Sequence, residues 1–278
     1  MIESVRGSQG RLRLLTIKDV LPALELSAEA GWNQTADDWR MLIDLAPQSC
    51  MGIEVDGELA ATTTLLCYGQ RLAWIGMVLT KIKFRGRGLA RRLLTEALTM
   101  ADQMKIESVK LDATDQGQPL YKKSGFRVEQ PVERWARAGI AAVISPSTGP
   151  NSLPKRWQEA DYEAFGEDRS ALIAKLAQHE SVWSHSKSFL LARSGSKTAY
   201  VGPCVSEDAQ VARSLIAQCA QRTQATLSWD LLSQNKNAVT LAKDFGFTPR
   251  RHLTRMVRGK DLRGREESIY ALAGFEFG

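Results

Sequence analysis

The sequence predicts a protein of the α/β (α+β) class built from two similar halves. Segments that alternate like strands recur between segments with the 3.6-residue spacing of helices. A strand–helix–Gly-Phe–strand order occurs twice, around Gly125-Phe126 and around Gly246-Phe247, which indicates an internal duplication. Residues 140–154 are rich in serine, proline and glycine and have the composition of a linker. We therefore expect one domain at residues 1–139 and a second at residues 155–278.

The elements of the first half follow from local residue patterns. Strand patterns occupy residues 11–16, 50–55, 58–66, 71–80 and 108–113, and a last one runs from Phe126 toward Trp135. Helical patterns occupy residues 19–30, 89–104 and 119–124. Thr35, followed by acidic residues, has the pattern of an N-cap for a further helix that ends at Pro47. Asp56-Gly57 predicts a tight hairpin turn. In the second half, residues 226–231 have a strand pattern before the Gly246-Phe247 turn.

Composition excludes several classes of protein. The chain has 278 residues, 44% hydrophobic and 24% charged, which is ordinary for a folded domain. No apolar run approaches the roughly 18 residues of a membrane span, and Met1–Arg6 lacks the layout of a secretory signal. The four cysteines form no CxxC pair and none lies close to a histidine. We therefore expect a cytoplasmic protein with no metal site and no membrane partner.

The net charge of +6 raises the possibility of a nucleic-acid partner. The first half, however, contains one compact basic cluster. It consists of Lys81, Lys83, Arg85, Arg87, Arg91 and Arg92. A local cluster suits a polyphosphate better than a long duplex, so we expect no nucleic-acid partner. For Lys81 and Lys83 the alternative is a solvated basic face.

Arg85-Gly86-Arg87-Gly88-Leu89-Ala90 is the candidate phosphate loop, between a predicted strand and a predicted helix. Glycines let the backbone turn tightly, and the first turn of a helix offers unpaired N–H groups to an anion. The arginines add charge-assisted contacts. The loop is neither a Walker A sequence nor a GxGxxG fingerprint. The alternative is a basic turn at a helix start.

At these positions the chain resembles the GNAT superfamily of N-acetyltransferases. The loop matches the superfamily's Arg/Gln-x-x-Gly-x-Gly/Ala pattern, and Tyr121 to Phe126 match its Tyr-x-x-x-Gly-Phe pattern. A closer resemblance is to tandem acetyltransferases with a GNAT-like C-terminal domain. It is carried by residues 31–35, 111–114, 165–169 and 269–276. The resemblance implies two tandem GNAT-like domains, each a mixed, largely antiparallel sheet flanked by helices.

The resemblance also implies that acetyl-CoA is the co-substrate. The backbone of Val78 and Thr80 would pair with the pantetheine arm, and the amides of the loop would hold the pyrophosphate. The residues implied to bind the cofactor are Val78, Leu79, Thr80, Arg85, Gly86, Arg87, Gly88, Leu89, Ala90 and Arg91. The superfamily often has a proline where this chain has Ile82. This departure affects the rigidity of the loop more than phosphate binding.

Two residues are predicted to take part in the chemistry. By the resemblance Tyr121 lies near the thioester sulfur, and its phenol can protonate the leaving thiolate because the two pKa values are comparable. The alternative is a tyrosine packed in the core. Asp112, at the end of a predicted strand, is our candidate for substrate contact or general base, and the alternative is a turn-capping carboxylate. A neutral amine would attack the acetyl carbonyl while strand N–H groups stabilise the oxyanion.

The acceptor pocket is predicted from both halves. Trp32, Asn33 and Gln34 are expected to line it from the first half. The second half has Glu207 and Asp208 where a phosphate loop would be, so we expect it not to bind CoA productively. Its predicted contribution to the acceptor pocket consists of Phe165, Asp168 and Arg169. For Asp168 and Arg169 the alternative is a surface ion pair.

The leading hypothesis is an acetyl-CoA-dependent N-acetyltransferase that acts on a primary amine of a small molecule or peptide. The alternative is a non-catalytic acyl-CoA-binding or regulatory module. Cys67, on a predicted strand with no adjacent base, is expected to pack in the core rather than carry an acetyl group. The chain is expected to be a monomer or homodimer, and its sequence does not identify the acceptor amine.

Overall fold

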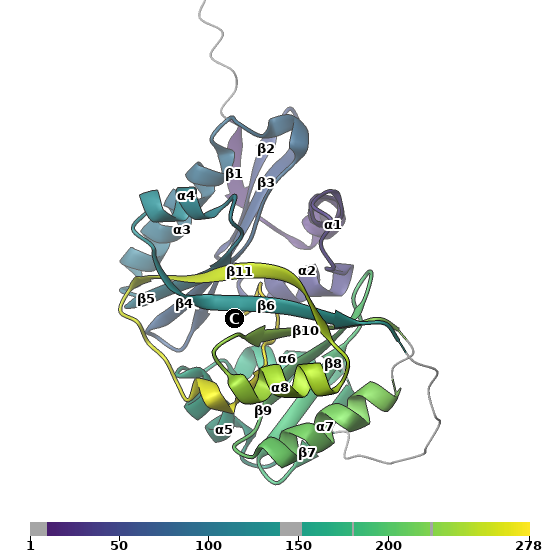
Figure 1. Cartoon of the computed structure of the whole chain (residues 1–278). Coiled ribbons are helices and arrows are strands. Elements are labelled where there is room, and N and C mark those ends of the chain that lie inside the picture. The colour runs from purple at the N-terminus through teal and green to yellow at the C-terminus, as the bar shows by residue number, and fades with distance from the viewer. Residues whose placement is uncertain (1–9, 140–151, 180, 223–224) are drawn as a thin grey trace, which may run out of the picture. The chain divides into compact units, whose positions relative to one another are not determined.

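The computed structural model describes residues 10–139, 152–179, 181–222 and 225–278 (Figure 1). These residues form two compact units. The first comprises the described residues up to Leu66 together with Ile75–Ile106. The second comprises Cys67–Trp74 and Glu107–Gly278. Most of the predicted linker, residues 140–151, lies outside the described residues.

The first unit contains a sheet in the order β1-β2-β3-β4. Its strands are β1 (Arg11–Leu14), β2 (Cys50–Val55), β3 (Glu58–Tyr68) and β4 (Leu72–Thr80), of which the last two continue into the second unit. Its helices are α1 (Val20–Glu29), α2 (Ala36–Leu45) and α3 (Leu89–Gln103). The predicted hairpin is confirmed, because Asp56 and Gly57 both have the positive φ of a type I′ turn, 51° and 79°.

Local capping explains where the elements of the first unit begin and end. Thr35 Oγ1 accepts from the backbone N–H of Asp38 at 3.2 Å, and Asp38 Oδ2 accepts from that of Thr35 at 2.7 Å. This capping box confirms the predicted start of α2. The first strand is shorter than predicted because the backbone N–H of Thr16 donates to Asp19 Oδ2 at 2.8 Å and starts a short 3₁₀ helix.

The second unit contains a longer sheet, in the order β4-β5-β11-β6-β10-β9-β8-β7 with β12 beside β9. Its further strands are β5 (Ser108–Ala113), β6 (Arg127–Arg137), β7 (Ser181–His185), β8 (Ser188–Arg193), β9 (Ala199–Val205), β10 (Leu227–Leu232), β11 (Thr248–Gly259) and β12 (Ile269–Ala271). Its helices are α4 (Gln118–Lys123), α5 (Trp157–Phe165), α6 (Ser170–His179), α7 (Ala209–Arg222) and α8 (Lys236–Asp244).

The strands that follow the two Gly-Phe turns are exchanged within this sheet. β11 belongs to the second half of the chain, yet it lies between β5 and β6 of the first half (Figure 1). β6 lies in turn between β11 and β10, with Trp135 opposite Trp229. The proposed boundary between residues 1–139 and 155–278 stays a prediction, but strands from both sides of it alternate in one sheet.

The predicted fold class is confirmed. The pairings described within each unit are antiparallel except for β4 with β5 and β9 with β10, which are parallel. Each Gly-Phe turn has its glycine in the left-handed region, at φ 85° for Gly125 and 77° for Gly246. Each also follows a short helix and leads into a long strand, in agreement with the predicted internal repeat.

Candidate functional site

The candidate phosphate loop connects β4 to α3 in the first unit. Gly86 and Gly88 have φ values of 77° and 78°, which favour glycine over any L-residue with a side chain. A Cβ atom built on either glycine would meet no atom within 4 Å. The two glycines are therefore required by backbone conformation, and the space beside them is open to a ligand.

The first turn of α3 is left open to an anion. Its N-cap is Gly88, which has no side chain to bond the amides that follow. Arg85, Arg87 and Arg91 are exposed around this helix start. The guanidinium of Arg87 lies 5.2 Å from the ring of the buried Phe84, which ties the loop to the core. The helix dipole and the arginines together favour a negatively charged ligand.

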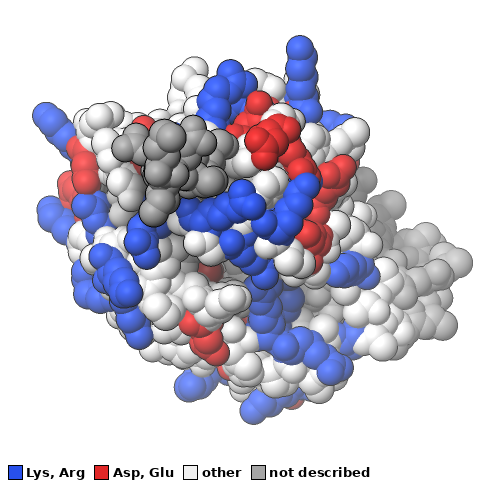
Figure 2. Space-filling view, turned by 90° about the horizontal axis from the view of Figure 1, so that it is seen from above, with Lys and Arg blue, Asp and Glu red and all other residues white. Residues whose placement is uncertain are grey.

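The rest of the predicted basic cluster is partly neutralised. Lys81 and Lys83 both form ion pairs with Glu58. The Lys83 side chain is 62% exposed, in agreement with the alternative of a solvated face, whereas that of Lys81 is only 13% exposed. The loop arginines remain as exposed cations at the start of α3. Figure 2 shows Lys and Arg side chains scattered over a face that is mostly neither basic nor acidic, with a band of acidic side chains at its upper right.

Ile82 explains the departure from the proline that is frequent in the superfamily. Its backbone N–H donates to Glu29 Oε2 at 3.0 Å. Proline has no N–H and could not form this hydrogen bond. In this chain the hydrogen bond from Ile82 to Glu29 of α1 holds the segment before the loop in place.

Strand β4 is bent just before the residues predicted to meet the pantetheine arm. Met77 has a φ of 51° although it is buried and is not glycine. Such a conformation costs roughly 1–2 kcal/mol. Val78 and Thr80, which follow it, are half-buried, whereas Leu79 between them is buried. The two predicted contact residues therefore share one face of the strand.

The predicted acceptor residues of the first unit lie between α1 and α2. Trp32 is half-buried, and Asn33 and Gln34 are 5% and 4% exposed. The Oε1 atom of Gln34 is buried without a hydrogen-bond partner. Such an atom normally needs a partner, and a substrate N–H group would provide one.

In the second unit Tyr121 lies on α4. It is 8% exposed, and its ring packs edge-on against Phe126 with the centroids 5.9 Å apart. Burial raises the pKa of the Tyr121 hydroxyl to about 12. The phenol is therefore protonated at neutral pH, as a proton donor to a thiolate must be. The packing also agrees with the structural alternative, so its chemical role stays a prediction.

Asp112 is held in a buried ion pair. Its two carboxylate oxygens accept from Arg255 Nε at 2.9 Å and Arg255 Nη2 at 3.0 Å. Its side chain is fully buried, and the guanidinium of Arg255 lies 4.6 Å from the ring of Trp74. Burial raises the pKa of Asp112, while the charge of Arg255 opposes that rise. This geometry favours a structural role over the predicted contact with substrate, and it is not a turn cap either.

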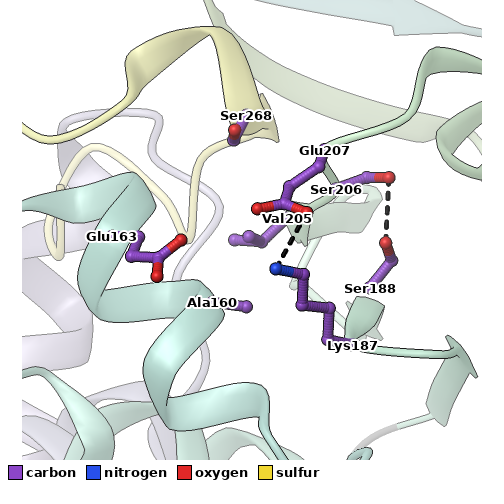
Figure 3. A pocket seen from close by; sticks show the side chains of 8 residues that line it. All are labelled: Ala160, Glu163, Lys187, Ser188, Val205, Ser206, Glu207 and Ser268. Carbon is purple, nitrogen blue, oxygen red and sulfur yellow. Dashed lines mark hydrogen bonds and ion pairs between the residues drawn. The ribbon is translucent and has the colours of Figure 1, made fainter.

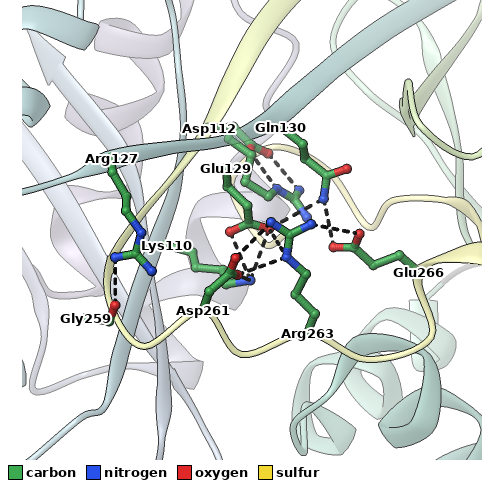
Figure 4. A network of polar contacts seen from close by, with 10 residues as sticks. Lys110, Asp112, Arg127, Glu129, Gln130, Gly259, Asp261, Arg263 and Glu266 are labelled. Carbon is green, nitrogen blue, oxygen red and sulfur yellow. Dashed lines mark hydrogen bonds and ion pairs between the residues drawn. The ribbon is translucent and has the colours of Figure 1, made fainter.

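Arg255 is the residue that sequence reasoning missed. One sequence pattern points to it: Arg134 and Arg255 follow the glycines of the two Gly-Phe turns at the same spacing, so they occupy the same position in the repeat. Arg134 forms the matching pair with Asp230, at 2.6 Å for both hydrogen bonds. Around Asp112 the ionic network continues through Lys110, Glu129, Asp261, Arg263 and Glu266 (Figure 4).

The predicted acceptor residues of the second half make contacts within the protein, and their role in the acceptor pocket stays a prediction. Phe165 is buried edge-on against Tyr68, with the centroids 5.3 Å apart. Arg169 is buried and forms two hydrogen bonds of 2.9 Å with Asp161, so the suggested surface pair with Asp168 is wrong. Asp168 is exposed and caps α6 by accepting from the backbone N–H of Ser170 at 2.8 Å. Hydrogen bonds from the Ser170 side chain and then from its backbone N–H lower the pKa of Asp168.

Cys67 corrects a further expectation. The predicted packing in the core is wrong, because Cys67 is the exposed residue near the end of β3. The strand alternation turns its side chain outward between the buried residues Leu66 and Tyr68.

Comparison with protein families gives a match to each half. One acetyltransferase (GNAT) domain model matches residues 27–143 and a second matches residues 158–271. Together they span most of the chain. The chain belongs to the GNAT acetyltransferases, with two such domains in tandem. Members of this family transfer acyl groups from acyl-CoA, which acts as co-substrate.

Two curated relatives are named as acyltransferases. The chain is 25% identical over 237 residues to an uncharacterized N-acetyltransferase, YitH, of Bacillus subtilis (strain 168), covering 81% of this chain and 83% of the relative. It is 27% identical over 238 residues to the holothin acyltransferase of Pseudoalteromonas sp. (strain SANK 73390), covering 81% and 79%.

Solved structures share the tandem GNAT fold. A Pyrococcus horikoshii protein named as an acetyltransferase superposes with a TM-score of 0.86 at 21% identity, covering 100% of this chain and 99% of the other. A tandem GNAT protein from the clavulanic acid biosynthesis pathway superposes with a TM-score of 0.64 at 13% identity, covering 90% and 98%. At these identities the likeness concerns the fold alone.

In the second GNAT domain a carboxylate of the protein bonds the amides at the start of α7. In the first domain the corresponding amides of α3 have no side-chain cap. Asp208 Oδ1 accepts from the backbone N–H groups of Gln210 and Val211, at 2.6 and 3.2 Å, at the start of α7. Glu207 beside it forms ion pairs with Lys187 at 2.8 Å and with Arg265 at 3.2 Å. A phosphate would therefore have to displace a carboxylate that already satisfies these amides.

The cavity beside this loop is small. It is lined by Ala160, Glu163, Lys187, Ser188, Val205, Ser206, Glu207 and Ser268 (Figure 3). Its volume of about 10 Å³ has room for roughly one water molecule. Ser188 and Ser206 close one side through a hydrogen bond of 3.0 Å between their hydroxyl groups. A pyrophosphate does not fit this cavity, which supports the expectation that the second GNAT domain does not bind CoA.

Within the described residues, no three or more His, Cys, Asp or Glu side chains are grouped as a metal site requires. No helix described there combines the length and apolar character needed to span a membrane.

Proposed function

We propose that the chain is an acetyl-CoA-dependent N-acetyltransferase that transfers the acetyl group directly to a primary amine of a small molecule or peptide. The observation that carries this proposal is the open start of α3. There Gly88 leaves the first-turn amides without a side-chain cap, and exposed arginines surround them. An acyl-CoA offers the paired phosphates that such a site binds.

The contrast between the two helix starts supports the first GNAT domain as the one that binds CoA. α3 begins at a glycine, whereas α7 begins at Asp208, whose carboxylate bonds the first-turn amides. The same topological position thus has uncapped amides in one domain and amides capped by a carboxylate in the other. One cofactor per chain is the stoichiometry that we expect.

The proposed chemistry needs one proton donor and one set of oxyanion donors. The neutral amine nitrogen forms a bond to the acetyl carbon and loses one proton to an ordered water or a carboxylate. The carbon–sulfur bond breaks, and the leaving thiolate takes a proton from a donor. Tyr121, whose phenol is protonated at neutral pH, is our candidate donor by its likeness to the superfamily's tyrosine. Backbone N–H groups near Val78 would stabilise the oxyanion. We no longer assign the base to Asp112, because Arg255 occupies both of its oxygens.

The acceptor is proposed to meet Trp32, Asn33 and Gln34. The unpartnered Gln34 Oε1 suits an N–H donor such as an amine or an amide. One relative is named as an acyltransferase for holothin, so acyl chains longer than acetyl belong in any test. A cytoplasmic location, no nucleic-acid partner, and a monomer or homodimer remain predictions from the sequence.

The test is release of free CoA from acetyl-CoA and from longer acyl-CoAs in the presence of amino acids, polyamines, aminoglycosides and peptides. Thiol-reactive dye reports the free CoA, and mass spectrometry identifies the acylated product. Turnover with an amine supports the proposal. Tight CoA binding with no turnover on this panel would instead favour the acyl-CoA-binding module, and failure to bind CoA would overturn both.

A further inference from the structure

Three consecutive threonines on β3 lie inside the first unit. Thr62, Thr63 and Thr64 are each 0% exposed. Valine has nearly the same shape without a hydroxyl, and burying a hydroxyl is unfavourable unless it finds a hydrogen-bond partner. A run of buried threonines in a core strand therefore indicates that at least one hydroxyl forms a hydrogen bond that the fold requires.

The partners of two hydroxyls lie at the bend of β4. Thr62 Oγ1 donates to the backbone carbonyl of Met77 at 2.8 Å. Thr63 Oγ1 donates to that of Gly76 at 3.5 Å, the limit of a hydrogen bond. Met77 is the residue with the left-handed φ of 51°. The carbonyl of the residue at the bend therefore accepts a hydrogen bond from a side chain of the neighbouring strand.

The bend decides how the end of β4 is presented. One left-handed residue interrupts the pleat and re-aims the residues that follow it. Those residues are Val78, Leu79 and Thr80, the predicted contacts of the pantetheine arm. A strained conformation persists only where its surroundings hold it. The 2.8 Å hydrogen bond from Thr62 is one contact that holds it.

We propose that Thr62 is a positioning residue, whose hydroxyl fixes the bend at Met77 so that Val78–Thr80 can pair with the pantetheine arm. This inference rests on the proposed use of acyl-CoA. Thr62 acts through the backbone of β4 and is not itself proposed to touch the cofactor. Because the phosphate loop is held separately by Phe84 and by the bond from Ile82 to Glu29, Thr62 should matter for the arm and not for the phosphates.

The experiment compares two ligands on four variants. CoA carries the pantetheine arm, whereas adenosine 3′-phosphate 5′-diphosphate has the same phosphates without it. Thr62→Val removes the hydroxyl and keeps the shape. Thr62→Ser and Thr62→Ala form a second pair that differs only in the hydroxyl. The control is Thr99→Val on the exposed face of α3, where Oγ1 donates to the Thr95 carbonyl at 2.9 Å.

Thr62→Val is expected to weaken CoA binding about tenfold in calorimetric titration, the effect of losing one good hydrogen bond. Its affinity for the arm-less nucleotide should stay at the wild-type value. Thr62→Ser should bind CoA as the wild type does and Thr62→Ala about tenfold more weakly. Thr99→Val should change neither affinity.

Three outcomes overturn the inference. They are unchanged CoA affinity in Thr62→Val, equal losses in the Ser and Ala variants, and parallel losses for both ligands. The Ser and Ala pair decides the matter if Thr62→Val does not fold. A wild-type protein that binds neither ligand overturns the proposed function as well, whereas wild-type binding with an unaffected Thr62→Val overturns only the role of Thr62.

Discussion

Arg255 and Asp112 form a two-point ion pair that joins β11, from the second half of the chain, to β5, from the first. Arg134 and Asp230 form the reciprocal pair, from β6 of the first half to β10 of the second. Each arginine also lies over an aromatic ring, Arg255 over Trp74 and Arg134 over Tyr200. Each of these two arginines, which occupy the same position in the repeat, is therefore paired with an aspartate from the other half of the chain.

Removing one member of such a pair leaves a buried charge without its partner. Asp112→Ala is expected to lower the free energy of unfolding by about 3–5 kcal/mol, because Arg255 stays buried. Urea denaturation followed by circular dichroism measures the change. The matched control is Asp37→Ala, where the Asp37 carboxylate is 90% exposed and pairs with Arg40 on the surface of α2. That change should stay within about 0.5 kcal/mol. A similar small effect at Asp112 would show that the pair is not a structural one.

Gly88 tests the phosphate loop. Gly88→Glu should reduce CoA affinity at least about a hundredfold, because the carboxylate enters the anion site and repels the phosphates. Titration calorimetry with CoA measures the affinity. Gly57→Glu is a closely matched control, since Gly57 has nearly the same φ, 79° against 78°, and equally open space around its Cβ position. It should lose a similar amount of stability and no CoA affinity. Equal CoA binding by both variants would refute the loop assignment.

Tyr121 separates chemistry from binding. Tyr121→Phe keeps the ring packed against Phe126 and removes the proton donor. We expect turnover to fall about a hundredfold, the lower range for a general acid, with the Kd for CoA nearly unchanged. Pre-steady-state rates and CoA titration on the same samples measure the two effects. Turnover equal to wild type would assign Tyr121 to packing alone.

The raised pKa of Tyr121 has a consequence at alkaline pH. Its folded-state pKa of about 12 lies above the unfolded value of about 10, so the folded state favours the protonated phenol. The stability from this group is complete below about pH 10 and is lost as the pH rises toward 12. Denaturation at pH 8 and pH 11 should therefore show a larger loss for the wild type than for Tyr121→Phe. An equal loss in both proteins would contradict this linkage.

Asp168 distinguishes a helix cap from an acceptor contact. Asp168→Ala removes the side chain that accepts from the Ser170 N–H, so unfolding free energy should fall by about 1 kcal/mol. Because hydrogen bonds from the Ser170 side chain and backbone N–H lower the pKa of Asp168, the difference from wild type should shrink as the pH falls through that pKa. A weaker apparent affinity for the acceptor with no change in stability would restore the predicted substrate role.

Local features of the fold were predictable because short-range forces decide them. The hairpin at Asp56-Gly57, the capping box at Thr35 and the glycine turns at Gly125 and Gly246 depend on residues within a few positions of each other. The loop at Gly86 and Gly88 belongs to the same class. Its backbone conformation is a property that glycine supplies at its own position.

The partners of buried charges were not predictable in this way. Nothing close in sequence to Asp112 indicates that residue 255 will occupy both of its oxygens, and Arg169 likewise pairs with Asp161 rather than with its neighbour Asp168. A carboxylate at the end of a strand has the same sequence pattern whether it faces solvent or a guanidinium. Burial separates the two cases, and burial depends on the whole sheet.

By itself the sequence determined the α/β class, the duplication, the glycine loop at the start of α3 and the likeness to GNAT acetyltransferases. Only the tertiary structure decided that the strands after the two Gly-Phe turns change places, that Asp112 belongs to an ion pair, and that Thr62 meets the bend at Met77. The physical reason is the distance along the chain over which each kind of interaction acts. Backbone propensities and caps act over one turn of chain, whereas strand order and side-chain pairing depend on which distant segments exclude water together.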